Sequence, residues 1–254
     1  MIKLYTDMKK YNLTFITDED LFKHVKNTVE KYRFEIDLGK FNKNLLDPIK
    51  LTFDSKVYNK ELQEIVESEI IRQLDKSNTN HIGYFHQNIF KYFGKGWSVP
   101  EKGFDIVHIQ KKIFVEMKNK HNTMNSSSSQ KTYMRMMAKL NENPKATCLL
   151  VEVIARNSQN IKWRVNLDSE SVSHENIRRV SIDKFYEIVT GEQYAFKNLC
   201  EVLPFVIRDV IKSRKVSLIK NTVFTELKKI SPNLLKSLYL LSFKKYEGFE
   251  KLKM

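Results

Sequence analysis

The sequence is poor in cysteine, in long apolar runs and in acidic residues, and each shortage narrows what the chain can be. Its two cysteines, Cys148 and Cys200, lie among apolar neighbours. They predict small buried side chains in a reducing compartment rather than a disulfide or a metal pair. No apolar run approaches membrane-spanning length, and the N-terminal residues lack the hydrophobic core of a signal peptide. We therefore expect a soluble, cytoplasmic protein that has no membrane partner.

Several cofactor motifs are also missing from the sequence. It contains no glycine-rich phosphate loop, which disfavours an ATP-driven activity. It contains no CxxC pair, and the spacing of His81, His86 and His121 matches no zinc motif. A nuclease that holds its metal through histidines is therefore disfavoured.

The charge of the chain is strongly one-sided. Lysine and arginine number 44 against 30 aspartate and glutamate residues, which gives a formal net charge of +14. Such an excess suits a polyanionic partner, and nucleic acid is favoured over an anionic membrane. A general bias of composition toward lysine is the competing explanation. The excess is nevertheless uneven, because residues 206–254 are especially basic.

Hydrophobic spacing predicts a mixture of helices and short strands in 254 residues, enough for a sizeable core. Helices are expected at 18–33, 59–75, 81–93 and 131–141, and throughout most of 181–245. Short strands are expected at 106–107 and 113–115, a buried central strand at 147–154 and an edge strand at 163–165. The pattern divides the chain into an N-terminal helical region (1–57), a core (58–170) and a basic helical C-terminal region (171–254).

The two short strands carry the most informative residues. Asp105 directly precedes the first strand, and Glu116 and Lys118 follow the apolar residues of the second. Because residues two apart on a strand point to the same face, Glu116 and Lys118 project together, and a hairpin would bring Asp105 beside them. Two carboxylates and an ammonium group suit Mg²⁺ held against a scissile phosphate. The competing interpretation is a set of solvated charges at strand ends.

This D…ExK pattern resembles that of the PD-(D/E)XK nucleases, with Phe104-Asp105 where that family usually has Pro-Asp. The block from His81 to Ser128 further resembles the SinI-like group of type II restriction endonucleases. Segments at 148–155, 158–160, 177–181 and 189–191 add to this resemblance. It implies an α/β (α+β) fold with a PD-(D/E)XK core, in which a small mixed sheet is flanked by helices.

The resemblance also implies a function and a site. It makes Asp105 and Glu116 the ligands of Mg²⁺, with a contribution from the Met117 carbonyl, and makes Lys118 the catalytic lysine. The family cuts double-stranded DNA at GGNCC or GGWCC sites. A two-fold-symmetric target favours a homodimer. A cognate DNA methyltransferase is expected in the same cell.

Three further residues are candidates for a place near the catalytic group. Glu69 could complete the metal shell, although a solvated helix charge is the more ordinary interpretation. His86 and Gln87 lie on the expected helix that leads to the strands and could face the site or a phosphate. A polar cap on a surface helix explains them almost as well.

Polar residues after two of the strands are candidates for DNA contacts. Asparagine can form bidentate pairs with adenine, lysine can donate to guanine, and arginine suits phosphate contacts. Ordinary loop capping and a hairpin turn compete with this interpretation. The candidates are Lys120, His121, Asn122, Asn125, Gln159, Asn160, Arg178 and Arg179.

Two other functions remain open at this point. A structure-specific DNA repair nuclease, a nickase or a junction resolvase could share the same fold and the same three catalytic residues. A basic DNA-binding protein without catalytic activity would need the positive charge but not the carboxylates.

Overall fold

The computed structural model describes residues 11–94, 96–167, 170–213, 220–246 and 249–253. The chain forms two compact units, each built from two separate stretches of sequence. One unit comprises Met1–Glu30 and Ile82–Arg214, and the other comprises Lys31–His81 and Lys215–Met254. The predicted three-part division at residues 57 and 170 stays a prediction.

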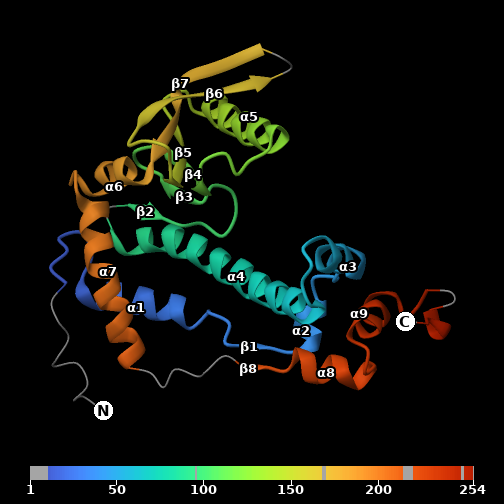
Figure 1. Cartoon of the computed structure of the whole chain (residues 1–254). Helices are drawn as coiled ribbons and strands as arrows, with labels where there is room; N and C mark the ends of the chain where they lie inside the picture. Colours follow the sequence, from blue (N-terminus) through green and yellow to red (C-terminus); the bar gives the residue numbers. More distant parts are fainter. Residues whose placement is uncertain (1–10, 95, 168–169, 214–219, 247–248, 254) are drawn as a thin grey trace. The chain divides into compact units, whose positions relative to one another are not determined.

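The first unit is built on a six-stranded mixed sheet (Figure 1). In spatial order its strands are β2 (Trp97–Ser98), β3 (Ile106–His108), β4 (Ile113–Lys120), β5 (Thr147–Ile154), β7 (Glu170–Ser181) and β6 (Asn160–Leu167). Strands β4, β5 and β7 are parallel, whereas β2–β3, β3–β4 and β6–β7 pair antiparallel. The predicted α+β class, with a small mixed sheet, is confirmed.

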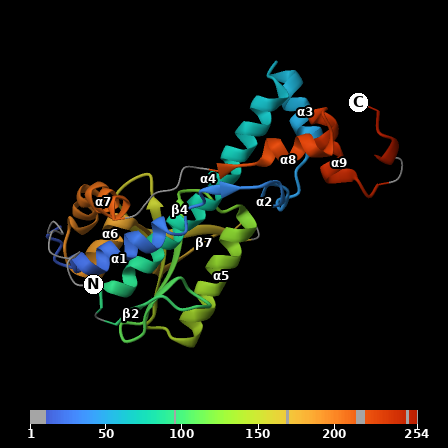
Figure 2. The same ribbon diagram turned by 90° about the horizontal axis from the view of Figure 1, so that it is seen from below.

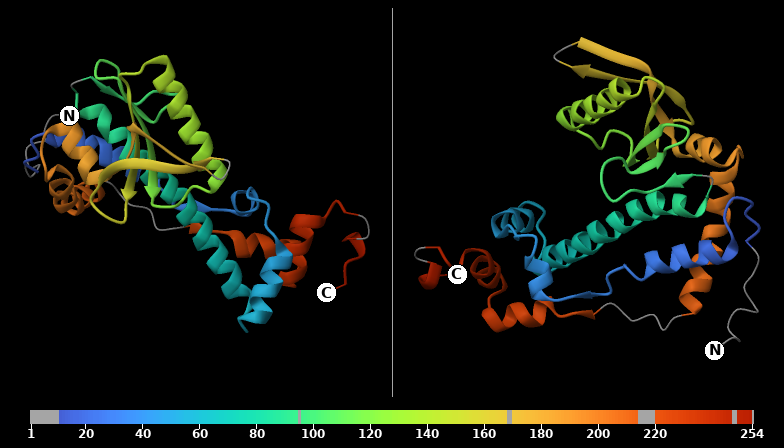
Figure 3. Two further views of the ribbon diagram at one scale, coloured as in Figure 1. Left: turned by 90° about the horizontal axis from the view of Figure 1, so that it is seen from above. Right: turned by 180° about the vertical axis from the view of Figure 1, so that it is seen from behind.

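The sequence explains the middle of this sheet better than its edge. Four consecutive residues of β5, Cys148 to Val151, are almost fully buried, as expected for a central strand covered on both faces. The predicted edge strand at 163–165 is confirmed within β6. Strand β7 was not predicted, because its polar residues break up the apolar alternation that would mark it. It forms the long hairpin with β6 that Figure 3 shows.

Helices cover both faces of the sheet (Figure 2). On one face, α5 (Ser126–Glu142) packs its Tyr133 and Met136 against Trp163 of β6. On the other face, the core joins Met117 of β4 to the helices α1 (Asp18–Val29), α6 (Ile182–Thr190) and α7 (Ala195–Lys212). Successive side chains of β4 therefore point alternately to the face that α5 covers and to the face that α1, α6 and α7 cover.

The predicted helices at 59–75 and 81–93 are wrong as separate elements. The structure has a single helix, α4 (Leu62–Asn88), followed by a 3₁₀ turn at Ile89–Tyr92. The polar residues 76–80 include neither proline nor glycine, so nothing in them stops a helix. Further along, Gly83 allows a close approach to β4, because a Cβ there would lie 3.3 Å from the Asn119 side chain.

The second unit has its own apolar core. It contains α2 (Leu38–Asn42), α3 (Pro48–Val57), the first part of α4, α8 (Val223–Ile230) and α9 (Leu234–Phe243). Two short parallel strands, β1 (Glu35–Ile36) and β8 (Lys220–Asn221), pair within it. Phe41, Val66 and Leu238 are among the residues buried at its centre. The C-terminal region is thus largely helical among the described residues, as predicted.

One of the two cysteines is buried and the other is exposed. Cys148 is buried in β5, as predicted. Cys200 is exposed, so the prediction is wrong there, because α7 is amphipathic and Cys200 follows the inward-facing Leu199. Both thiols are free. None of the helices in the described part of the chain is long and apolar enough to cross a membrane.

Candidate active site

A hairpin places Asp105 beside the middle of β4. The backbone N–H of Asp105 donates to the carbonyl of Val115 at 2.9 Å. In turn, the N–H of Met117 donates to Asp105 Oδ2 at 2.7 Å. Gly103, with φ of +95°, allows the turn of the chain just before this point. The expected pairing of the two strands is therefore confirmed, and the carboxylate is held by the backbone of its neighbour.

Glu116 and Lys118 point to the same face of β4 and contact each other. Lys118 Nζ lies 2.7 Å from Glu116 Oε1. The other carboxylate oxygen of Glu116 accepts from the guanidinium of Arg135 on α5. Arg135 also reaches the carbonyl of Gly103 at 3.3 Å and lies over the ring of Phe104, 4.7 Å from its centroid. Both oxygens of the largely buried Glu116 are thus occupied by cations of the protein.

Arg135 is a member of this group that sequence reasoning missed. It lies 19 positions after Glu116 on α5. The helix was predicted, but the sequence does not show which residue of β4 a charged side chain of that helix contacts. The two residues line one cleft of about 650 Å³ between β4 and α5. Its other lining residues are Lys118, Thr123, Met124, Ser128, Lys131 and Thr132.

The carboxylates of Asp105 and Glu116 repel each other. Burial raises the pKa of Asp105, and the charge of Glu116 adds to the rise. The Met117 N–H, Lys118 and Arg135 only partly offset these effects. A divalent cation would favour the ionised form of Asp105 and relieve the repulsion.

The residues at the cleft fit Mg²⁺ in number and in kind. No group of three or more acidic, histidine or cysteine side chains placed to hold a metal occurs among the described residues. Mg²⁺ does not require such a cage, because it is usually bound through one or two carboxylates together with waters and substrate phosphates. Asp105 and Glu116 meet that requirement. The proposed contribution of the Met117 carbonyl stays a prediction.

A second polar cluster lies next to Lys118, around a buried acid that the sequence analysis did not single out. Glu152 of β5 is the register partner of Lys118 and is 1 % exposed. It accepts from Arg179 of β7 and contacts His121 Nδ1 at 3.1 Å. The same Arg179 nitrogen lies 2.7 Å from His121 Nδ1 and 3.4 Å from Asn122 Oδ1. The only sequence signal was a lone acid within the apolar run 147–154.

The charges of this cluster are balanced internally. Burial alone would raise the pKa of Glu152, but the hydrogen bonds and charges of Arg179 and His121 outweigh it and lower that pKa. Glu152 is therefore a carboxylate at neutral pH. The cluster gathers three of the predicted DNA-contact residues, His121, Asn122 and Arg179, around one anion.

Other predicted DNA-contact residues lie elsewhere. Arg178 and Arg179 are adjacent on β7 and so face opposite sides of the sheet. Arg178 donates to the side chain and to the carbonyl of Asn160, both at 2.5 Å. The backbone N–H of Gln159 donates to Ser181 Oγ at 2.9 Å. The structure thus separates Arg178 and Asn160 from the face that carries Lys118, and their roles stay predictions.

Asn125 has a structural task that needs no DNA. It is the N-cap of α5, and its Oδ1 accepts from the backbone N–H of Ser128 at 2.8 Å. We expect Asn125→Ala to lower the free energy of unfolding by about 1 kcal/mol, because the first turn of the helix loses a partner. Asn125→Asp, which also caps helices, should retain most of that stability in urea unfolding. If Asn125→Asp kept the wild-type stability but lost its preference for one DNA sequence over others, Asn125 would be assigned to base contact instead.

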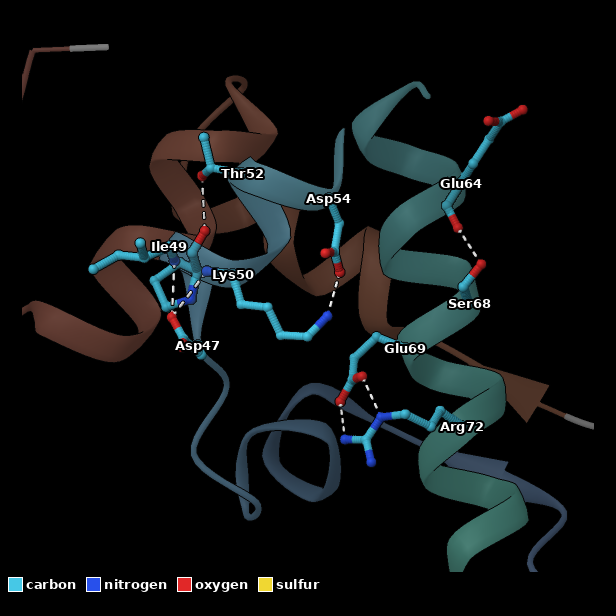
Figure 4. A network of polar contacts seen from close by, with 10 residues as sticks. Asp47, Ile49, Lys50, Thr52, Asp54, Glu64, Ser68, Glu69 and Arg72 are labelled. Carbon is cyan, nitrogen blue, oxygen red and sulfur yellow. Dashed lines mark hydrogen bonds and ion pairs between the residues drawn. The ribbon is translucent and has the colours of Figure 1, made fainter. Parts of the chain in front are cut away.

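The remaining candidates are Glu69, His86 and Gln87. Glu69 belongs to the other compact unit, where it forms a two-pronged ion pair with Arg72, with both contacts at 2.6 Å (Figure 4). Burial alone would raise the pKa of Glu69, but hydrogen bonds from Arg72 and Gln73 lower it. Burial lowers the pKa of His86 to about 4, so this ring is neutral at pH 7. The lining of the Glu116 cleft includes none of the three candidates, whose roles stay predictions.

Fold and site together define a class of protein. A mixed sheet flanked by helices, with two acids and a lysine on adjoining strands, is consistent with a restriction-endonuclease-like fold. The sequence profile of the Eco47II restriction endonuclease family matches residues 13–212.

Two characterised relatives are similar over most of their length. The type II restriction enzyme Sau96I of Staphylococcus aureus is 35 % identical over 218 residues, which cover 80 % of this chain and 82 % of the relative. The type II restriction enzyme Eco47II of Escherichia coli is 29 % identical over 214 residues, covering 80 % and 89 % respectively. This chain belongs to the Eco47II restriction endonuclease family. The prediction of a type II restriction enzyme is confirmed at that level.

Proposed function

We propose that this protein hydrolyses phosphodiester bonds of double-stranded DNA at a short specific site and that it requires Mg²⁺. The observation that carries the proposal is that the β3–β4 hairpin brings Asp105 beside Glu116 and Lys118 in a member of a restriction endonuclease family. The net charge of +14 supports a polyanionic substrate.

Each of the three residues has a distinct task. Asp105 and Glu116 would hold Mg²⁺, and the N–H of Met117 orients Asp105. When bound, the metal stabilises negative charge on the scissile phosphate and on the leaving oxygen. Lys118 holds the attacking water in line with the bond to be cut and balances the charge that develops on the phosphate. The water oxygen bonds to phosphorus as the bond to the 3′ oxygen breaks; the attacking water gives one proton to the solvent, and the 3′ oxygen takes one proton from the solvent.

The target and the assembly are further parts of the proposal. We propose a GGNCC- or GGWCC-type site, as the sequence resemblance implies. A symmetric target is cut most simply by a homodimer in which each subunit cleaves one strand. A cognate methyltransferase would then protect the host DNA.

The direct test is to incubate the purified protein with a long DNA of known sequence in Mg²⁺, with an EDTA control, and to map the fragment ends. We expect discrete ends at one short motif, and only when Mg²⁺ is present. Ends without a common motif would favour a structure-specific repair nuclease or nickase. Binding without any cleavage would favour a DNA-binding protein and would contradict the proposal.

A further inference from the structure

Arg135 of α5 contacts both chain segments that carry the acids of the candidate site. Its guanidinium donates to Glu116 Oε2 and to the carbonyl of Gly103, and it lies over the ring of Phe104, which directly precedes Asp105. We propose that Arg135 competes with Mg²⁺ for Glu116, so that the metal binds strongly only when a DNA phosphate enters the cleft and becomes the new partner of the arginine. This inference rests on the proposed function, because it takes Asp105 and Glu116 as the ligands of Mg²⁺.

The two oxygens of Glu116 are the first reason. Lys118 Nζ lies 2.7 Å from Oε1, and Arg135 contacts Oε2. The Glu116 side chain is only 11 % exposed, so few other orientations are open to it. Mg²⁺ requires carboxylate oxygens in a nearly ideal octahedral arrangement. A cation that Glu116 holds must therefore share an oxygen with one of the two basic side chains or displace it.

The balance of charge is the second reason. Asp105 feels the charges of Glu116, Lys118 and Arg135, so the four side chains form one electrostatic group. Two of them are acidic and two are basic, and their formal charges cancel when all four are ionised. A divalent cation gains little attraction from a group without net charge, and Arg135 repels it directly. A phosphate brings the negative charge that shifts this balance toward the metal.

The ability of Arg135 to change partners is the third reason. Its side chain is 41 % exposed and lines the cleft of about 650 Å³. Lys131 lies one helical turn earlier on α5, is exposed and lines the same cleft. A phosphate that enters the cleft meets both cations, and arginine binds phosphate in the same two-pronged manner as carboxylate. The neutral contacts with Gly103 and Phe104 keep the arginine close when it releases Glu116.

The competition couples metal binding to DNA binding. A phosphate that draws Arg135 from Glu116 strengthens the binding of Mg²⁺, and Mg²⁺ that takes Glu116 leaves Arg135 available to DNA. Each ligand must therefore strengthen the binding of the other by the same factor. The metal is then loaded chiefly on the protein that already holds DNA.

The first test compares Mg²⁺ binding by the wild type and by Arg135→Gln in the absence of DNA, by titration calorimetry. Glutamine removes the charge but keeps a donor for Glu116, and the exposed position should tolerate it. We expect Arg135→Gln to bind Mg²⁺ about 5–150-fold more tightly, the usual range for coupling between two ligands. Adding Glu116→Gln to this variant should abolish the gain. Lys139→Gln is the matched control, because Lys139 lies one turn further along α5, over the ring of Phe114 at 4.9 Å, and it should bind Mg²⁺ like the wild type.

The outcomes separate this inference from the proposed function. Unchanged or weaker Mg²⁺ binding by Arg135→Gln would overturn the inference alone, because an arginine that only positions Glu116 assists the metal instead of competing with it. If neither the wild type nor Arg135→Gln bound Mg²⁺, the inference and the metal site of the proposed function would both fail.

A second measurement tests the coupling through DNA. The affinity for one duplex is measured in Ca²⁺, which also takes carboxylate oxygens, and in EDTA, and the duplex is checked for cleavage on a gel. We expect Ca²⁺ to strengthen DNA binding by a larger factor in the wild type than in Arg135→Gln, where the competitor of the metal is already absent. Equal factors in the two proteins would overturn the coupling. Both measurements report binding, so they do not depend on cleavage.

Discussion

Lys118→Ala is expected to slow DNA cleavage by about 10²–10⁴-fold while leaving site-specific binding largely intact. The reason is the position of Lys118: its Nζ is 2.7 Å from Glu116, and the side chain is still partly open to the cleft. The substitution removes the group that holds the attacking water but leaves both carboxylates in place. Single-turnover cleavage in Mg²⁺ and binding in EDTA give the two quantities separately.

Two control variants sharpen this test. Lys118→Arg keeps the positive charge but changes its geometry, so it should bind DNA like the wild type and still cleave more slowly. Lys139→Ala removes a lysine of α5 that pairs with Glu142 and is absent from the cleft lining, and it should cleave at the wild-type rate. Undiminished cleavage by Lys118→Ala would remove Lys118 from the mechanism.

Glu152→Gln is expected to lower the free energy of unfolding by about 2–3 kcal/mol at pH 7. Breaking a buried ion pair typically costs about 3–5 kcal/mol, and partial exposure of Arg179 reduces this figure. Glutamine keeps the shape of the side chain but not the charge that Arg179 and His121 share. The expected second effect is weaker DNA binding, because Arg179 loses the partner that sets its position.

The stability effect should depend on pH in a defined direction. The pKa of Glu152 is lower in the folded protein than in the unfolded chain, where it is about 4.3. Its stabilising contribution is therefore complete above that value and is lost as the pH falls through the folded-state pKa. Urea unfolding should show a large difference between wild type and Glu152→Gln at pH 7 and a smaller one near pH 4.

Glu175→Gln provides the matched control for this change. Glu175 is an exposed acid on β7 that pairs with Lys162, so the same substitution there should have little effect on unfolding. If Glu152→Gln were as stable as Glu175→Gln at pH 7, the buried pair would contribute nothing and the proposed role of Glu152 in positioning Arg179 would fail.

Sequence reasoning reached the features that depend on local pattern. Asp105, Glu116 and Lys118 were identified from alternation along two short strands, and the structure pairs those strands as a hairpin. The central strand at 147–154 was recognisable because burial on both faces requires a continuous apolar run. The boundary between helices near residue 78 was placed wrongly, since a polar stretch without proline or glycine can remain helical.

Features that depend on distant residues could not be reached in this way. Arg135 contacts Glu116 from a different element, and Glu152 meets Arg179 across 27 positions of sequence. No periodic spacing and no sequence motif connects the two residues of either contact, so the sequence gives no sign that they meet. The separation of Arg178 from Arg179 follows only from the register of β7 against β5, which turns neighbouring side chains to opposite faces.

The resemblance of the sequence pointed to type II restriction enzymes, and its hydrophobic pattern indicated the mixed α+β class. Strand alternation also nominated Asp105, Glu116 and Lys118 as the catalytic group, an assignment that stays a prediction, because such local patterns reside in nearby residues. The tertiary structure decided which cations face those acids and which acid holds Arg179. The physical reason is that a charge is neutralised by whichever partner the packing of separate strands and helices brings within contact distance, and that partner has no fixed position along the chain.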